Sequence, residues 1–279
     1  MPIDLDYLSS WTGRTVRSTD VISVELTRRY NATLGEFSSL DSSASVGAMA
    51  PAGIHWCLAP LVADKQSLDR DGHPMRGDLI PPVPLPRRMW AAGSLQFLDT
   101  LLVGDEVTRQ STVKDLVLKE GRSGPLVFLT VSHASSTTRG DAVIEEQQIV
   151  FREASAALEA ADTSPPRPVS NDSRSFNEVT LFRYSALTFN GHRIHYDRPY
   201  AAFEGYPHLV VHAPLQASLL LYRAISENGG RLPREFRFRA VQPLFCGQAF
   251  EVSLTRAAGR MELFLSTSDG PSMTARSEL

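Results

Sequence analysis

The chain has 279 residues, a length that suits one large domain or two smaller ones. Hydrophobic residues make up 42% and charged residues 21%, which is ordinary for a protein with a substantial buried core. The net charge of −3 excludes the strongly basic surface that nucleic-acid binding needs, so we expect no nucleic-acid partner.

The N-terminal residues MPIDLDYLSS show neither a basic start nor an apolar stretch, so we expect no secretory signal. No run reaches the roughly 18 apolar residues of a membrane-spanning helix, so we expect no membrane association. Cys57 and Cys246 lie far apart without metal-site spacing, which favours two free thiols in a reducing compartment. We therefore expect a cytoplasmic protein.

The first half of the chain reads as one short helix followed by antiparallel strands. Residues 51–62 are the helix candidate, although Pro60 limits its length. Residues 84–113 show two alternating strand-like runs separated at Gly104. Two further strand candidates follow at 126–134 and 142–151. The stretch 161–175 is rich in Pro, Ser and Asp, and we interpret it as a linker.

The second half repeats this order. Residues 212–230 predict a buried helix, because Pro214 suits a first turn, leucines surround the helix, and Gly229 and Gly230 end it. Strand candidates follow within 232–254, at 261–267 and at 272–279. We therefore predict an α+β fold made of two tandem units, 1–160 and 176–279, each an antiparallel sheet wrapped around one helix.

The segment LTFNGHRIHYD, residues 187–197, holds two of the seven histidines. His192 and His195 could be metal ligands, a general base with its neighbour, or surface residues. A metal site would need them to converge with Asp197 and His208. The spacing contains no helical i, i+4 pair and no nearby cysteine, so we expect no metal.

Asn190, His195 five residues later, and the helix start VVHAPLQASLLL together resemble the signature of the MaoC-like hydratases of the hot-dog fold. In that family the Asn190 position usually carries an acid and the Ala213 position a glycine. PPVPLPRRMWAAG and KEGRSGPLVFLTV are similar to a narrower branch, the type 2 hydroxyacyl-thioester dehydratases and the hydratases of 3-methylfumaryl-CoA and itaconyl-CoA. The resemblance implies a tandem double hot-dog fold.

The resemblance also implies roles for these residues. His195 would be the general base and acid, since histidine titrates near the working pH. Asn190 would orient the water, and the Ala213 backbone N–H would hold the thioester oxygen at the positive end of a helix. We expect His212 to cap or support that helix start, and His192 to lie on the solvent side or behind His195.

In the first half, residues 28–37 would be the matching loop. They contain no histidine, and the residue five beyond Glu36 is Asp41. We therefore expect a catalytically silent first half that shapes the acyl and CoA tunnel.

For the anionic parts of a CoA ester, the candidate substrate-binding residues are Arg87, Arg88, Trp90, Tyr184 and Arg193, with Arg183 and Arg198 as further cations. Arg88 and Trp90 are our candidates for a distal carboxylate. We expect hydration of 3-methylfumaryl-CoA or itaconyl-CoA to citramalyl-CoA, as in itaconate degradation.

Three alternatives stay open: a dehydratase of fatty-acid synthesis, a non-catalytic acyl-thioester-binding protein and a metal-dependent hydrolase. We expect no cofactor beyond the CoA of the substrate, and either a monomer or a homodimer.

Overall fold

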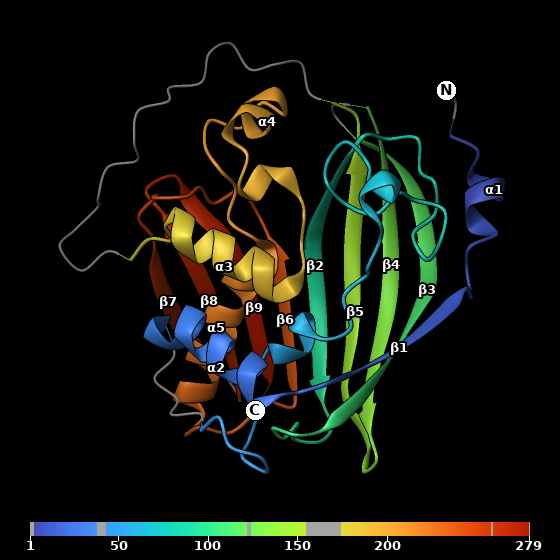
Figure 1. Ribbon diagram of the computed structural model, residues 1–279. Coiled ribbons are helices and arrows are strands. Elements are labelled where there is room, and N and C mark those ends of the chain that lie inside the picture. Colours follow the sequence, from blue (N-terminus) through green and yellow to red (C-terminus); the bar gives the residue numbers. More distant parts are fainter. Residues whose placement is uncertain (1–2, 38–42, 122–123, 155–173, 258, 279) are drawn as a thin grey trace.

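The computed structural model describes residues 3–37, 43–121, 124–154, 174–257 and 259–278. The strands of these residues form one antiparallel sheet of nine strands, in the order β1-β3-β4-β5-β2-β6-β9-β8-β7 (Figure 1). The strands are β1 (Thr15–Val21), β2 (Arg87–Phe97), β3 (Glu106–Gly121), β4 (Gly124–Thr137), β5 (Gly140–Arg152), β6 (Glu235–Ala240), β7 (Glu251–Ala257), β8 (Arg260–Thr267) and β9 (Gly270–Glu278).

The two halves of the chain meet in the middle of this sheet. β2 of the first half pairs antiparallel with β6 of the second, from Ala92 opposite Arg239 to Gln96 opposite Glu235. The strands expected from the alternating runs are all present, and the predicted α+β class with a large antiparallel sheet is confirmed. β1 was not predicted. It pairs with β3 at the outer edge of the first half.

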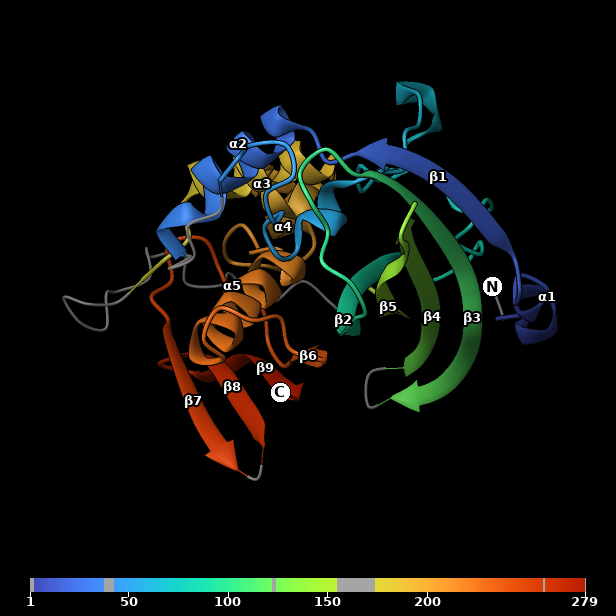
Figure 2. The same cartoon turned by 90° about the horizontal axis from the view of Figure 1, so that it is seen from below.

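The long helix of the second half is α5 (Ala213–Glu227), as the leucine-rich segment predicts. Pro214 lies in its first turn, where a missing backbone N–H costs no helical hydrogen bond. Leu215, Leu219, Leu220 and Leu221 are all buried, so apolar side chains surround the helix. Figure 2 shows α5 on the concave side of the curved strands β6–β9.

The helix predicted at 51–62 in the first half is wrong. Only the 3-10 turn η2 (Ile54–Cys57) forms there, between Gly53 at φ +86° and Ala59 at φ 44°. A Cβ at Gly53 would lie 2.8 Å from the Tyr30 hydroxyl, so the chain turns where it packs on a neighbouring helix. Two left-handed residues and Pro60 leave no room for a longer helix.

The loop predicted at 28–37 is also wrong, because these residues lie in α2 (Val24–Leu34) and η1 (Gly35–Phe37). The Ser23 side chain caps α2 by accepting the Leu26 N–H. Leu26, Tyr30 and Leu34 recur every four residues and are buried. That spacing is visible in the sequence and predicts this helix.

Other short elements complete the fold. They are α1 (Leu5–Ser9), η3 (Lys65–Ser67), α3 (Glu178–Thr188), η4 (Arg193–His195) and α4 (Arg198–Phe203). Almost all of the predicted linker 161–175 lies outside the described residues. Among the helices described, none is both long and apolar enough to cross a membrane.

Candidate active site

The histidine-containing segment begins where α3 ends. Phe189 closes α3 in a left-handed conformation, at φ 51°, which is unfavourable for a large side chain and reverses the chain sharply. Asn190 follows, and its Oδ1 accepts the backbone N–H of His192 at 2.9 Å. The amide therefore stabilises its own loop through the oxygen, while its NH₂ group is left to donate to another partner.

His195 is buried in η4, as a base in a water-excluding site would be. Its Nδ1 lies 2.7 Å from the Val210 carbonyl oxygen, so Nδ1 carries the proton and Nε2 is left as the basic nitrogen. Burial lowers the pKa of His195 to about 4. The imidazole is therefore neutral at neutral pH, and it readily gives up any proton that it gains.

The start of α5 lies directly beside this ring. The rings of His195 and His212 stack with centroids 3.6 Å apart, and Ala213 is the next residue. Because Ala213 is the first residue of α5, its N–H has no acceptor within the helix. His212 makes no side-chain cap, but its Nε2 lies 2.9 Å from Ser185 Oγ, so it supports the helix start from α3.

His192 is not on the solvent side, since only 6% of it is exposed. Its ring lies 5.3 Å from the ring of His195 on one side and 4.4 Å from that of His73 on the other. Burial and the nearby His195 lower the pKa of His192 to about 3. His192 therefore joins the segment 187–197 to a residue from the first half of the chain.

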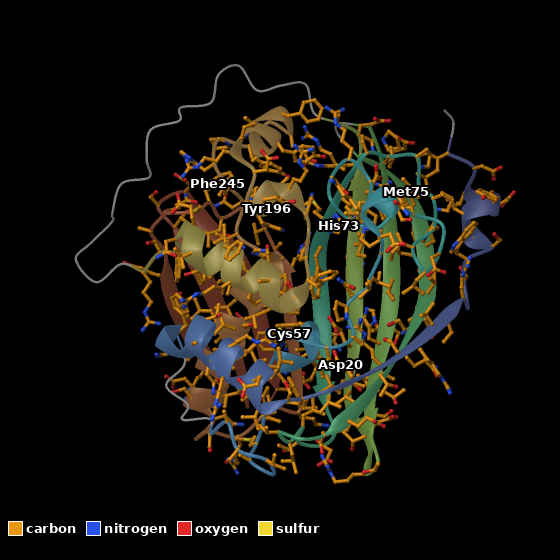
Figure 3. All side chains as sticks on the ribbon, in the orientation of Figure 1. Asp20, Cys57, His73, Met75, Tyr196 and Phe245 are labelled. Atoms are coloured by element: carbon orange, nitrogen blue, oxygen red, sulfur yellow. The ribbon has the colours of Figure 1, made fainter. Side chains whose placement is uncertain are left out.

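The sequence reasoning missed the residues on that first-half side. Asp71 and His73 lie in the segment DRDGHP before β2, and Arg88 reaches them from β2. Figure 3 shows His73 and Tyr196 on the two sides of the junction between the halves. An acid and a histidine beside a turn glycine, in a segment of low apolar content, is the signal that could have indicated these residues.

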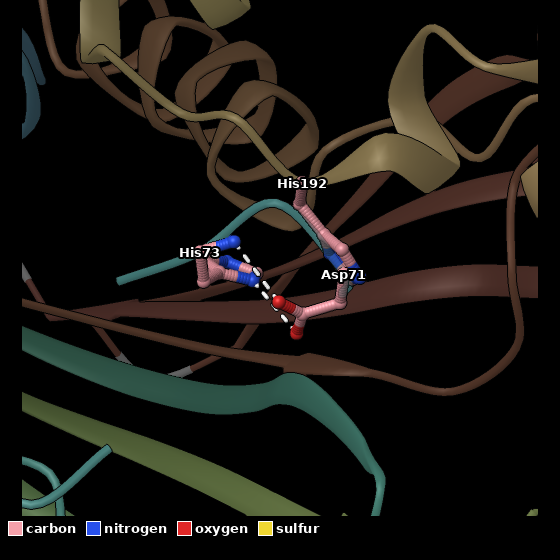
Figure 4. Close-up of side chains that lie close together, drawn as sticks. All are labelled: Asp71, His73 and His192. Carbon is pink, nitrogen blue, oxygen red and sulfur yellow. Dashed lines mark hydrogen bonds and ion pairs between the residues drawn. The ribbon is translucent and has the colours of Figure 1, made fainter. Parts of the chain in front are cut away.

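Asp71, His73 and His192 lie close together (Figure 4), with potential ligand atoms within 4.8 Å of one another. These three residues could therefore supply three ligand atoms to one metal ion. However, Nε of Arg88 lies 3.2 Å from Asp71 Oδ2 and 3.0 Å from His73 Nδ1. A divalent ion on these atoms would lie beside a guanidinium and be repelled by it. We interpret the cluster as built around Arg88.

The other predicted substrate-binding residues differ in how many of their hydrogen-bonding groups already have a partner in the protein. The Trp90 indole N–H donates to the Ala92 carbonyl, and its ring packs on Trp56 and Phe238. Arg193 is committed to Asp197, at 2.7 Å, and to the Arg70 carbonyl. These two residues therefore already have partners within the protein.

Arg87 and Tyr184 are buried. The Tyr184 hydroxyl has no hydrogen-bond partner among the described residues, and burial raises its pKa. Arg88 also has a buried nitrogen, Nη2, without a partner there. Of the predicted arginines, Arg88 is the one that combines this unpartnered donor with a place beside the histidines.

The sequence profile of hydroxyacyl-thioester dehydratase type 2 matches residues 53–246, which span both halves and the segment 187–197. The chain belongs to this family. It is also 39% identical, over 94% of its length and 93% of the relative, to the mesaconyl-C(4)-CoA hydratase of Chloroflexus aurantiacus. Membership of the family makes the protein a hydro-lyase of acyl thioesters, as the signature around His195 predicts.

Solved structures show the same fold for this dehydratase-family chain. A MaoC-like dehydratase superposes with a TM-score of 0.71 at 14% identity, covering 98% of this chain and 99% of its own. A Mycobacterium tuberculosis protein with a double hotdog fold superposes with a TM-score of 0.59 at 13% identity, with 97% of both chains covered. The predicted tandem hot-dog fold is thereby confirmed.

Proposed function

We propose that the protein hydrates a branched C5 dicarboxylic CoA ester, 3-methylfumaryl-CoA or itaconyl-CoA, to citramalyl-CoA. The observation that carries the proposal is Arg88, whose buried Nη2 has no partner among the described residues and lies in the cluster that contacts His192. In 3-methylfumaryl-CoA the second carboxylate is attached to the carbon that receives the hydroxyl. Its binding group must therefore lie on the side of the base, and the rings of His73 and His192 link Arg88 to His195.

The acid–base chemistry belongs to the second half. With 3-methylfumaryl-CoA, whose C=C is conjugated to the thioester, His195 Nε2 takes a proton from water, and the water oxygen bonds to the β-carbon as the C=C electrons move toward the thioester. The Ala213 N–H, at the positive end of α5, stabilises the resulting enolate oxygen. His195 then gives its proton to the α-carbon. A low pKa suits this last step, because it makes protonated His195 a strong acid.

Asn190 orients the water. Because its Oδ1 already accepts the His192 N–H, its NH₂ group is the part that can hold the water oxygen. It exchanges no proton, so one imidazole carries the proton from water to carbon. We assign recognition of the substrate to residues 1–160, without a proton-transferring group there, and we propose no cofactor and no metal.

Comparing substrates tests this function. Wild type is mixed in parallel with 3-methylfumaryl-CoA, itaconyl-CoA and crotonyl-CoA, and product formation is followed by chromatography. We expect a dicarboxylic ester to have the highest kcat/KM. Arg88→Gln should lower that value about 10- to 100-fold, because a charge-assisted hydrogen bond to the carboxylate is lost. Arg239→Gln, on the neighbouring strand and exposed, is the control.

A preference for crotonyl-CoA would favour the dehydratase of fatty-acid synthesis instead. Tight binding of the CoA esters without turnover would favour an acyl-thioester-binding protein. Either result would overturn the assignment to a C5 dicarboxylic substrate.

A further inference from the structure

The segment 69–73 of the first half packs closely against the segment 187–197 of the second half, which carries His195. The Arg193 N–H donates to the Asp71 carbonyl at 2.9 Å. Gly72 and Gly191 approach so closely that a Cβ on Gly72 would lie 2.0 Å from the Gly191 carbonyl oxygen. Arg70 adds its guanidinium over the Phe203 ring of α4, 4.1 Å from the ring centre. The contact between the halves therefore depends on two glycines and several specific bonds.

The Asp71 carboxylate, 7% exposed, is the centre of this segment. Its Oδ1 accepts the His73 backbone N–H at 2.9 Å. Its Oδ2 lies 3.0 Å from His73 Nδ1 and 3.2 Å from Arg88 Nε. Both carboxylate oxygens are thus in use within the protein (Figure 4).

Arg88 is the fixed donor of this cluster. Arg88 Nε is always a donor, and an ionised Asp71 is always an acceptor. The Nε–H group of Arg88 lies within hydrogen-bond distance of both Asp71 Oδ2, at 3.2 Å, and His73 Nδ1, at 3.0 Å. A His73 Nδ1 without a proton accepts from Arg88, and a protonated Nδ1 donates to Asp71. In either tautomer Arg88 is held beside the Asp71 carboxylate.

These contacts hold the Arg88 guanidinium in place at its Nε atom. Bonding at Nε restricts the orientation of the Arg88 guanidinium plane, and the buried Nη2 in that plane has no hydrogen-bond partner among the described residues. Burial lowers the pKa of Arg88, and the Asp71 charge opposes this effect. Asp71 thus orients the arginine and opposes the effect of burial on its pKa.

We propose that Asp71, itself oriented by His73, is the positioning residue that presents Arg88 to the second carboxylate of the substrate. This inference rests on the proposed function. It makes the loop before β2 the element that selects dicarboxylic over monocarboxylic acyl groups, and it places that loop directly on the catalytic segment. Asp71 acts through Arg88 and touches no reacting atom.

The test is Asp71→Asn, because an amide offers one oxygen where the carboxylate uses two. Binding of the two products citramalyl-CoA and 3-hydroxybutyryl-CoA is measured by calorimetry, which needs no turnover. We expect the preference for the dicarboxylic ligand to fall at least about tenfold. Asp69→Asn, which removes the same charge from an exposed position on the same loop, should change it little.

A double variant separates positioning from a general structural effect. If Asp71 acts through Arg88, Asp71→Asn in an Arg88→Gln background should cause almost no further loss of preference. Additive losses, or equal losses for both ligands, would overturn the proposal. If Asp71→Asn does not fold, Arg88→Lys keeps the charge, removes the Nε–H, and should reproduce the loss.

The two proposals fail differently. A wild type that shows no preference for the dicarboxylic ligand contradicts the proposed function. A wild type with that preference, unchanged in Asp71→Asn, contradicts only the role of Asp71.

Discussion

The approach of Gly72 to Gly191 predicts the effect of a single methyl group. Gly72 has φ +90°, and a Cβ there would lie 2.0 Å from the Gly191 oxygen, where ordinary contact begins at 3.4 Å. In Gly72→Ala the two loops must therefore separate by roughly 1 Å, because packed interiors yield little. Gly191 lies between Asn190 and His192, so the shift moves the segment 187–197 and the proposed base His195.

A displacement of about 1 Å in a catalytic group can cost about 100-fold in rate, and we expect kcat of Gly72→Ala to fall by about that factor. The left-handed backbone adds about 1 kcal/mol or more of strain to the folded state. The measurements are kcat with 3-methylfumaryl-CoA and the urea midpoint of unfolding.

Gly77→Ala is the matched control. Gly77 has φ +120°, on the same stretch of chain, but a Cβ there would meet nothing within 4 Å. This variant should lose stability and keep kcat. The reasoning about close approach would be refuted if the two variants lost the same amount of activity.

Three further predictions concern pH and packing. Burial lowers the pKa of four histidines from the ordinary 6.5: to about 3 for His55 and His192, and to about 4 for His133 and His195. As the pH falls below 6.5, these histidines therefore take up protons in the unfolded chain before they do so in the folded protein. Each histidine then lowers the free energy of unfolding by up to about 2 kcal/mol by pH 5. Glu145 offsets part of this loss, because burial raises its pKa to about 7 and the folded protein therefore takes up a proton there first. The urea midpoint should therefore be clearly lower at pH 5 than at pH 7; equal midpoints would contradict the buried neutral state. The acid limb of kcat/KM should lie nearer pH 4 than 6.5 while the protein stays folded, and a limb at 6.5 would mean that the base is not the buried His195. Leu220→Ala, at a fully buried position of α5, should cost about 2–5 kcal/mol in urea unfolding, and a cost below 1 kcal/mol would contradict the central packing of that helix.

The sequence predicted the second half better than the first. α5 carries Pro214 at its start and leucines all round, and the strand runs alternate clearly, so local pattern and burial agree. The segment 51–62 is apolar like a helix, but its backbone is set by packing of Gly53 on Tyr30, a contact between residues far apart in sequence. α2 was missed although its Ser23 cap and its four-residue apolar spacing were visible.

The residues of the candidate site also differ in how far the sequence could predict them. Asn190, His195 and Ala213 lie within one stretch of chain, so a spacing rule can find them. Asp71 and His73 reach the same place from more than 100 residues earlier, through the fold of the first half. One sequence alone contains no signal of that convergence, nor of the contacts of Arg88 with Asp71 and His73.

The most direct test of the account is the rate of hydration of 3-methylfumaryl-CoA by wild type and His195→Ala, with citramalyl-CoA affinity measured for both. The account predicts rapid hydration by wild type, a loss of about 100-fold or more in the variant, and nearly equal product affinity. A variant that hydrates as fast as wild type would contradict His195 as the group that carries the proton.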